Sequence, residues 1–247
     1  MMSLTTTSLA ETVKKQYFYK LKANIDSFSS LVGIQILAIL FSLGGISSSG
    51  MGGSFVNVNV KYYSSDMVLI FTLIWSFITA VTITTRPYRN NDFSFVTNRL
   101  SSSLSNILFL VTASVLGSIT ALLSANLLQV ISYIFLDEQI YNIGNGTQHM
   151  ILGFTVSFLY LILIGACGYL IGALIQVSKL FIPLFPILFI GLLFLEGVVS
   201  NGFIVSNVYT FYAMESALIL FIIKTVFTAV ALFIAAISIL NRLEVRR

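Results

Sequence analysis

The sequence is poor in the residues from which soluble proteins and enzymes build their surfaces and sites. Of its 247 residues, 9% are charged, and it has one histidine, one cysteine, one tryptophan and three prolines. Soluble domains carry roughly 25% charged residues, so this composition excludes an ordinary soluble domain. The single Cys167 excludes a disulfide within the chain.

Catalytic and nucleotide-binding motifs are also missing. The chain has no HExxH, no GxSxG and no GxxxxGKS/T phosphate loop, and His149 belongs to no cluster with metal-ligand spacing. We therefore expect a chain that is not an enzyme, with no catalytic, metal-binding or cofactor-binding residue of its own. Any nucleotide hydrolysis is then expected from another polypeptide.

Apolar sequence is abundant, at 57% of all residues. Six long apolar segments occupy residues 28–43, 67–83, 104–135, 150–177, 180–195 and 216–240, the last covering 213–240 with its flank. A bilayer core about 30 Å thick takes ~20 helical residues, which each segment reaches with its flanks. The sequence thus predicts an all-α integral membrane protein, a single transmembrane domain of six helices.

Cationic residues indicate how these spans are oriented. With the N-terminus in the cytosol, 11 of the 13 lysines and arginines fall on the cytosolic side: Lys14, Lys15, Lys20, Lys22, Arg86, Arg89, Arg99, Lys179, Arg242, Arg246 and Arg247. The positive-inside rule then predicts cytosolic termini. These cations flank membrane spans, so the net charge of +4 indicates anionic lipid headgroups, not nucleic acid, as the partner. A cleaved signal peptide is the alternative for the first span, disfavoured by its long charged lead-in.

Residues 8–24, before the first span, predict an interfacial elbow helix. Ser8 and Glu11 have the spacing of a capping box, which marks a helix start. Apolar residues then recur at helical spacing, at Val13, Tyr17, Leu21, Ile25 and Phe28. We expect this helix to lie in the inner interface with its lysines among the headgroups. A solvated cytosolic helix is the alternative.

The third span is longer than a bilayer requires. Residues 104–135 would form a helix of about 48 Å at ~1.5 Å per residue, so its start projects into the cytosol. The preceding stretch, 90–103, holds the residues expected to dock a soluble partner: Asp92, Phe93, Phe95, Val96 and Arg99. Exposed aromatic residues beside a cation favour such a surface, and an amphipathic helix resting on lipid is the alternative.

Two segments expected on the outer side have patterns of their own. Alternating valine and asparagine over 56–61 predicts a small hairpin or extended cap. The segment 197–208 is too apolar for an ordinary loop and too short to span, so we expect a re-entrant pair of short helices. Just before it, Pro183 and Pro186 predict a kinked or broken fifth span.

Small residues supply faces on which helices can approach closely. They recur every four residues in the third and fourth spans, at Ala113, Gly117, Ala121 and Ala125 and at Gly168 and Gly172. Such faces pack spans within one chain or between two, and we expect packing within the chain.

Polar residues inside the spans are the remaining candidates for function. A lysine at the bilayer centre costs roughly 2.5–3.5 kcal/mol, so Lys224 should find a partner, for which Glu196 and Glu215 are placed. Such a pair either only holds the spans together or takes part in a translocation route. Thr72, Ser76 and Thr79 form a milder polar stripe on the second span.

The order of these elements resembles the membrane subunit of type-2 ABC exporters, the ABC-2 permease family. The resemblance covers the whole chain: elbow helix 8–24, six spans, coupling segment 90–103 and re-entrant segment 197–208. The leucine-proline-x-x-arginine-like run often found before the third span of that family keeps its arginine here, Arg99, and lacks the proline.

The resemblance implies a function and partners. It implies a small bacterial permease of the plasma membrane, exporting an amphipathic peptide, antibiotic or lipid-like cargo. It also implies a homo- or heterodimer of permeases on two cytosolic ATPase subunits, which bind ATP and Mg²⁺. The alternatives are a secondary transporter or channel, and a non-transporting scaffold or sensor subunit. An ATPase gene beside this one would discriminate best among them.

Overall fold

The computed structural model describes residues 8–43, 47–52, 57–62, 66–85, 88, 98–135, 147–198, 204–215 and 217–242. In order, its elements are α1 (Leu9–Ala23), α2 (Ile25–Leu43), β1 (Ser47–Gly52), β2 (Asn57–Tyr62), α3 (Asp66–Ile83), α5 (Arg99–Phe135), α6 (Thr147–Val177), α7 (Phe181–Val198), α8 (Ile204–Ala213) and α9 (Leu218–Arg242). Within these ranges, α2, α3, α5, α6 and α9 are long and apolar enough to cross a membrane, and α7 contributes a shorter apolar stretch. These five helices indicate a multi-pass membrane protein.

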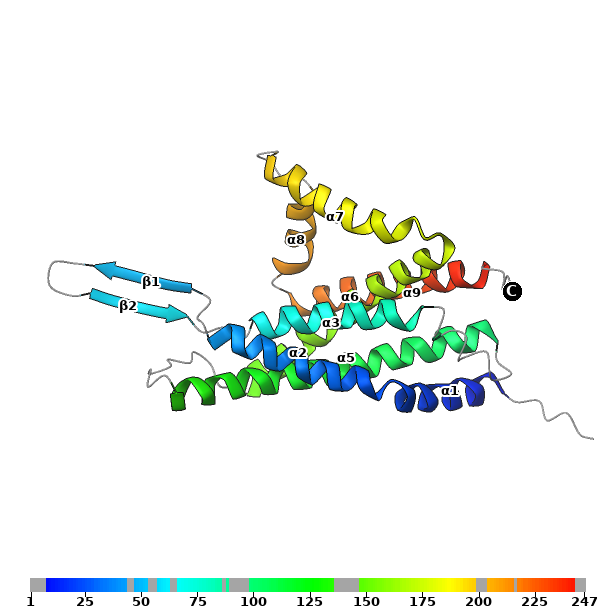
Figure 1. Cartoon of the computed structure of the whole chain (residues 1–247), viewed down its shortest axis with the longest axis horizontal. Helices are drawn as coiled ribbons and strands as arrows, with labels where there is room; N and C mark the ends of the chain where they lie inside the picture. The colour runs from blue at the N-terminus through cyan, green and yellow to red at the C-terminus, as the bar shows by residue number, and fades with distance from the viewer. Residues whose placement is uncertain are drawn as a thin grey trace, which may run out of the picture.

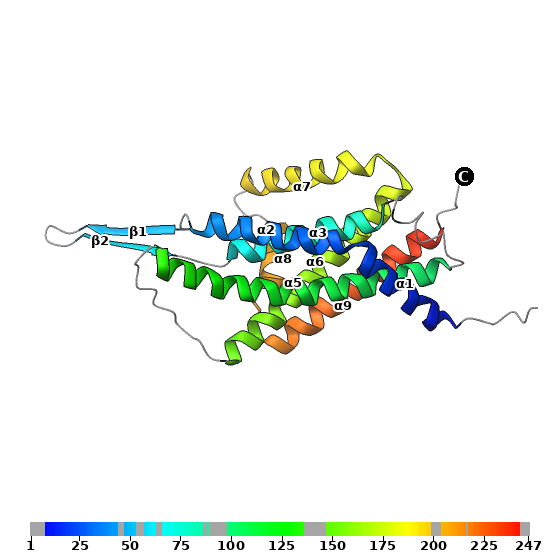
Figure 2. The ribbon, with the colours of Figure 1, turned by 60° about the horizontal axis from the view of Figure 1, so that its bottom comes forward.

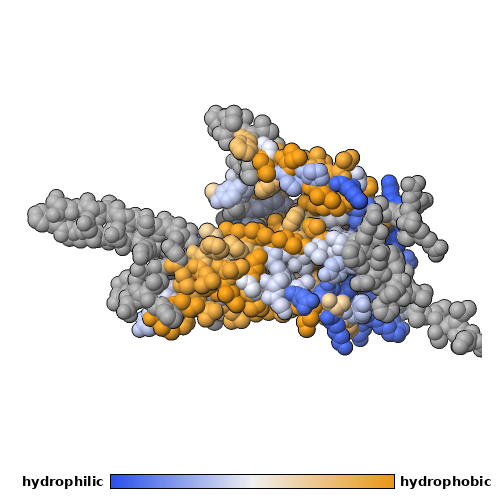
Figure 3. All heavy atoms as spheres, in the orientation of Figure 1, coloured by the Kyte–Doolittle hydropathy of each residue, from blue (hydrophilic) through white to orange (hydrophobic). Residues whose placement is uncertain are grey.

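The long helices run back and forth along one axis (Figures 1 and 2). One end of the bundle collects α1, the start of α5, the α6–α7 turn and the end of α9. We call it the cationic end, because these parts carry Lys14, Lys15, Lys22, Arg99, Lys179 and Arg242. Figure 3 shows the hydrophilic surface gathered at this end and apolar surface along the rest of the bundle.

The opposite end carries the hairpin of β1 and β2, which projects away from the helices (Figure 1). The strands are antiparallel, with Ser47 opposite Tyr62 and Gly52 opposite Asn57. The alternating pattern over 56–61 predicted a small hairpin or extended cap, and the structure shows the hairpin, with β2 as its second strand.

The start of α1 confirms the helix start predicted at Ser8, which is the N-cap residue. The Ser8 side-chain oxygen accepts a hydrogen bond from the Glu11 backbone N–H at 3.3 Å, which satisfies one of the free donors of the first turn. Glu11 in turn pairs with Lys15 one turn later, at 2.8 Å. The hydrogen bond and charge of Lys15 lower the pKa of the exposed Glu11 carboxyl.

Several boundaries differ from those expected. Helix α5 begins at Arg99, inside the stretch assigned to coupling, because serines and leucines there continue the helix without a glycine or proline. Helix α8 covers 204–213, later than the re-entrant segment predicted over 197–208.

The fifth span was expected to be kinked or broken, and of these the break is absent, since α7 is a single helix through Pro186. Pro183 falls in its first turn, where a missing N–H breaks no helical hydrogen bond.

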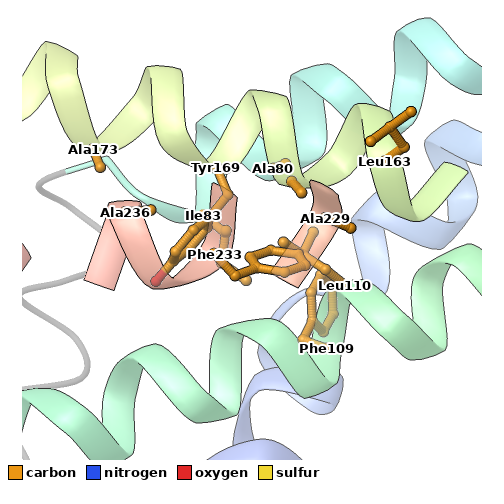
Figure 4. Close-up of a cluster of buried hydrophobic side chains, with 11 residues drawn as sticks. Ala80, Ile83, Phe109, Leu110, Leu163, Tyr169, Ala173, Ala229, Phe233 and Ala236 are labelled. Carbon is orange, nitrogen blue, oxygen red and sulfur yellow. The ribbon is translucent and has the colours of Figure 1, made fainter. Parts of the chain in front are cut away.

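The largest cluster of buried apolar side chains joins α3, α5, α6 and α9 (Figure 4). Tyr169 of α6 is fully buried, and its ring centroid lies 5.8 Å from that of Phe233 on α9. Phe109 of α5 packs in the same cluster, and its ring lies 5.9 Å from Phe28 of α2. Aromatic rings from different helices thus fill the centre of the bundle.

Close backbone contact between α3 and α6 confirms that the GxxxG pair packs within the chain. A Cβ on Gly168 would lie 2.7 Å from the Phe77 carbonyl oxygen, and one on Gly172 would collide with the Thr84 side chain. The stripe on α5 is used in the same way, because a Cβ on Gly117 would press on Leu161, Thr72 and Trp75. Small residues therefore set the spacing of α3, α5 and α6.

Replacing Gly168 with alanine should destabilise the protein by about 1–3 kcal/mol, because the added methyl group meets backbone that must move. Gly33→Ala on α2 is the matched control, since a Cβ there has no neighbour within 4 Å. Alanine is the better helix former by ~1 kcal/mol, so this control should keep or raise the melting temperature. Thermal unfolding in detergent measures both, and equal melting temperatures would contradict the contact.

Candidate functional site

A buried lysine fastens α1 to the start of α5 at the cationic end. The Lys20 side chain is 4% exposed, and its ammonium donates to the Ser102 carbonyl oxygen at 3.1 Å and to the Asn106 side-chain oxygen. Asn106 donates onward to the Tyr169 hydroxyl at 3.5 Å. This chain of contacts links α1, α5 and α6, and Lys20 therefore does not lie among headgroups as expected for the lysines of α1.

The whole buried face of α1 is polar apart from Val13. Gln16, Lys20 and Asn24 recur every four residues on it. They meet a start of α5 in which Ser101, Ser102, Ser103, Ser105 and Asn106 are all buried. A cavity of about 50 Å³ remains there, lined by Tyr19, Lys20, Ala23, Asn24, Ile83, Tyr88 and Asn106. Sequence reasoning missed this polar interface, although the four-residue spacing opposite a serine-rich run was readable.

The predicted docking residues fall mostly outside the described part of the chain. Asp92, Phe93, Phe95 and Val96 lie outside the described residues. Arg99 is described: it opens α5 and donates to the Asn241 carbonyl oxygen of α9 at 3.0 Å. The start of α5 is thereby tied to the end of α9 as well as to α1.

The polar stripe of α3 joins helices to one another. Thr72, Ser76 and Thr79 are buried. Ser76 donates to the Leu161 carbonyl oxygen of α6 at 3.1 Å. Thr72 accepts a hydrogen bond at 3.2 Å from the side-chain amide of Gln35, a buried residue of α2 that sequence reasoning missed.

Gln35 also connects a third helix. Its amide donates to the Thr120 hydroxyl of α5 at 3.0 Å, while Thr72 donates to the carbonyl oxygen of Val68 in its own helix. The side-chain N–H groups of Gln35 and the hydroxyls of Thr72 and Thr120 all have hydrogen-bond partners, as a bilayer interior favours. The network therefore holds α2, α3 and α5 together at one level.

Lys224 forms an ion pair with Glu215 at the junction of α8 and α9. Its ammonium contacts the Glu215 carboxylate and lies 4.4 Å from the centroid of the Phe211 ring. The two side chains are 27% and 18% exposed, so the pair is shielded but reachable. The side chain of Glu196, the other predicted partner, lies outside the described residues, although α7 includes its backbone.

A hollow of about 660 Å³ lies between α6, α8 and α9. We call it the tyrosine hollow, after three of its lining residues: Tyr160, Leu163, Ile164, Cys167, Val208, Tyr209, Tyr212, Thr228, Ala231 and Leu232. Tyr160 donates from its hydroxyl to the Tyr212 carbonyl oxygen at 3.1 Å, which ties α6 to the end of α8. Sequence reasoning missed this hollow, because its walls come from segments far apart in the chain.

Comparison with protein-family models, with curated proteins and with solved structures found no match to this chain. Within the described residues there is also no group of three or more His, Cys, Asp or Glu side chains placed to hold a metal ion. What the described residues offer is therefore hydrogen bonds between helices, the Lys224–Glu215 ion pair and an apolar hollow.

Lys224→Met should destabilise the protein, because it leaves the Glu215 carboxylate shielded and unpaired. We expect about 1–3 kcal/mol, less than the ~3–5 kcal/mol of a fully buried pair because both side chains keep some exposure. Adding Glu215→Leu should restore the melting temperature, whereas adding Glu196→Leu should not.

An unchanged melting temperature in Lys224→Met would contradict a structural role for the pair.

Proposed function

We propose that this chain is the membrane-spanning permease subunit of an ATP-driven exporter of the ABC-2 type. The observation that carries the proposal is the arrangement at the cationic end. There α1, a short helix before the first candidate span, packs on the first turns of the long α5, where the connection 89–97 joins it. An exporter of this type needs such a point, where force from a soluble motor enters the membrane helices.

Six passes of the chain fit this function. Helices α2, α3, α5, α6 and α9 are the five candidate spans, and α7 runs back between the ends of α6 and α8 (Figure 1). With α7 counted as the fifth pass, the six passes agree with the position of α1 and of the end of α9, which both lie at the cationic end. We assign that end to the cytosol, where lysine and arginine meet anionic headgroups. Helix α1 is then the interfacial elbow, and α8 with the segment before it is the re-entrant part.

Contacts at the cationic end support transmission of movement. Lys20 joins α1 to α5, and Arg99 joins α5 to α9. Displacement of the connection 89–97 would therefore move three helices together. We assign ATP and Mg²⁺ to two cytosolic ATPase subunits that dock on this connection, with a second permease, like or unlike, completing the assembly.

Cargo is assigned by the chemistry of the membrane part. Many hydroxyl and amide groups among the spans are bonded to neighbouring helices or to their own backbone, as at Gln35 and Ser76, whereas the buried hydroxyls of Ser42 and Ser132 have no hydrogen-bond partner. Such an interior favours an amphipathic peptide, antibiotic or lipid-like molecule over a charged solute. In the plasma membrane, such cargo would leave the cell from the bilayer.

Docking is tested by introducing negative charge at two apolar residues of the connection, Phe95 and Val96. Phe95→Asp combined with Val96→Asp should abolish co-purification of an ABC ATPase encoded beside this chain, while the permease still inserts. Val58→Asp combined with Val60→Asp, in the hairpin at the opposite end, adds the same charge and should leave recovery unchanged. Normal recovery of the ATPase with the Phe95→Asp, Val96→Asp variant would contradict the docking assignment.

Topology is tested by cysteine labelling from outside the cell, after Cys167 is replaced. Cysteines at Ser65 and Thr147 should react with a membrane-impermeant thiol reagent, because α3, which begins at Asp66, and α6, which begins at Thr147, both start toward the end of the bundle that carries the hairpin. Cysteines at Asn91 and Arg247 should react only after the membrane is opened. Labelling of intact cells at Asn91 would overturn the six-pass orientation.

A further inference from the structure

The cavity of about 50 Å³ beside Lys20 has a buried polar base. Lys20, Asn24 and Asn106 line it, and these side chains are 4%, 6% and 6% exposed. Tyr19, which is 41% exposed, and the half-buried Tyr88 line it as well. The cavity therefore reaches the surface at two tyrosines and ends at a lysine and two amides.

The base of this cavity is rich in hydrogen-bond donors. The Lys20 ammonium carries a charge, and its bonds to Ser102 and Asn106 go to neutral oxygen atoms. The amide nitrogens of Asn24 and Asn106 have two N–H groups each. Their bonds to the Lys20 carbonyl oxygen at 2.8 Å and to the Tyr169 hydroxyl at 3.5 Å use one N–H each. Among the described residues that line the cavity, none is acidic. These surroundings favour a ligand with negatively charged oxygen atoms.

Size and position narrow this ligand to a phosphate group. One water molecule needs roughly 10–15 Å³ of such a volume, so the cavity has room for about four, and a phosphorus atom with its oxygens takes similar space. Tyrosine is enriched where a protein crosses the membrane–water interface, which places the rim at headgroup level. Helix α1 and the start of α5 meet at the cationic end (Figures 1 and 2). Basic pockets between helices at such a level bind lipid headgroups.

We infer that the cavity beside Lys20 binds a phosphate group, with the ammonium and the two amides as its donors. The phosphate enters past Tyr19 and Tyr88, carried by a lipid headgroup or free in solution. This site differs from the general attraction of surface cations to anionic lipid, because its donors are buried and hold one group. The inference goes beyond the exporter assignment and does not depend on it, since the bilayer itself supplies headgroups.

Binding to the delipidated full-length chain in detergent tests this site, with native mass spectrometry to count bound lipid. Phosphatidic acid presents a terminal phosphate, and phosphatidylcholine with the same tails has its phosphate covered by choline. We expect one phosphatidic acid per chain, with a Kd about ten-fold below that for phosphatidylcholine. Inorganic phosphate, compared with chloride at equal ionic strength, is tested by the melting temperature.

The outcomes distinguish the two sources of phosphate. Preference for phosphatidic acid assigns the group to a lipid headgroup. A higher melting temperature in inorganic phosphate, without preference between the lipids, assigns it to solution. Equal binding of both lipids together with no effect of inorganic phosphate would overturn the site.

Charge variants locate the binding. Lys20→Met should weaken binding of the preferred phosphate probe about ten-fold, because it removes a charged donor. Lys22→Met removes the same charge from the exposed face of α1 and should change the Kd less than about two-fold. Equal losses in the two variants would contradict a site at Lys20.

A second variant keeps the lysine, since Lys20→Met also breaks the contact with α5. Asn106→Asp preserves the shape of the side chain and the oxygen that accepts from Lys20, and it adds a negative charge beside the cavity. Binding of the phosphate probe should again fall about ten-fold, by repulsion. Asn207→Asp, exposed on α8, adds the same charge elsewhere and should leave binding unchanged. Unchanged binding in folded Asn106→Asp protein would contradict the site.

Discussion

Helices in lipid gain little by hiding apolar surface from one another, because lipid tails are as apolar as the side chains. What α3 and α6 gain is close backbone approach, possible only because Gly168 and Gly172 carry no Cβ. The same approach brings the Ser76 hydroxyl onto the Leu161 carbonyl oxygen. Helices α5 and α9 then pack on a pair whose spacing is already fixed, and Tyr169 fills the space among the four.

Polar groups inside this bundle are arranged by a second constraint, the cost of leaving a donor or acceptor unbonded in lipid. At the cationic end the constraint joins α1 to α5, since the ammonium of Lys20 bonds a carbonyl and an amide oxygen of α5. A lysine in that position cannot slide along α5 without losing both partners. Helices α1 and α5 are therefore held together as one mechanical unit.

Features decided within one or two turns of sequence were predictable, and those decided by distant segments were not. The N-cap contact of Ser8 with Glu11 is local, and of the two acidic partners expected for Lys224 the structure shows the nearer one in sequence, Glu215. Burial of Lys20 depends on Asn106, 86 residues away, and no local pattern separates it from the exposed Lys22. The tyrosine hollow likewise depends on where α8 comes to rest. Pro186 misled because proline limits a helix without always ending it.

The only tryptophan of the chain, Trp75, stands where α3 meets α2. Its indole N–H donates to the Ser27 carbonyl oxygen at 3.1 Å and to the Ser30 hydroxyl at 3.0 Å, and its ring packs with Leu31 and Ala113. Fluorescence excited where tryptophan absorbs and tyrosine does not therefore comes from one indole, which lies among polar groups in an otherwise apolar contact. Separation of α2 from α3 would change the polarity around the Trp75 ring. The fluorescence of this residue would therefore report on how these two helices pack.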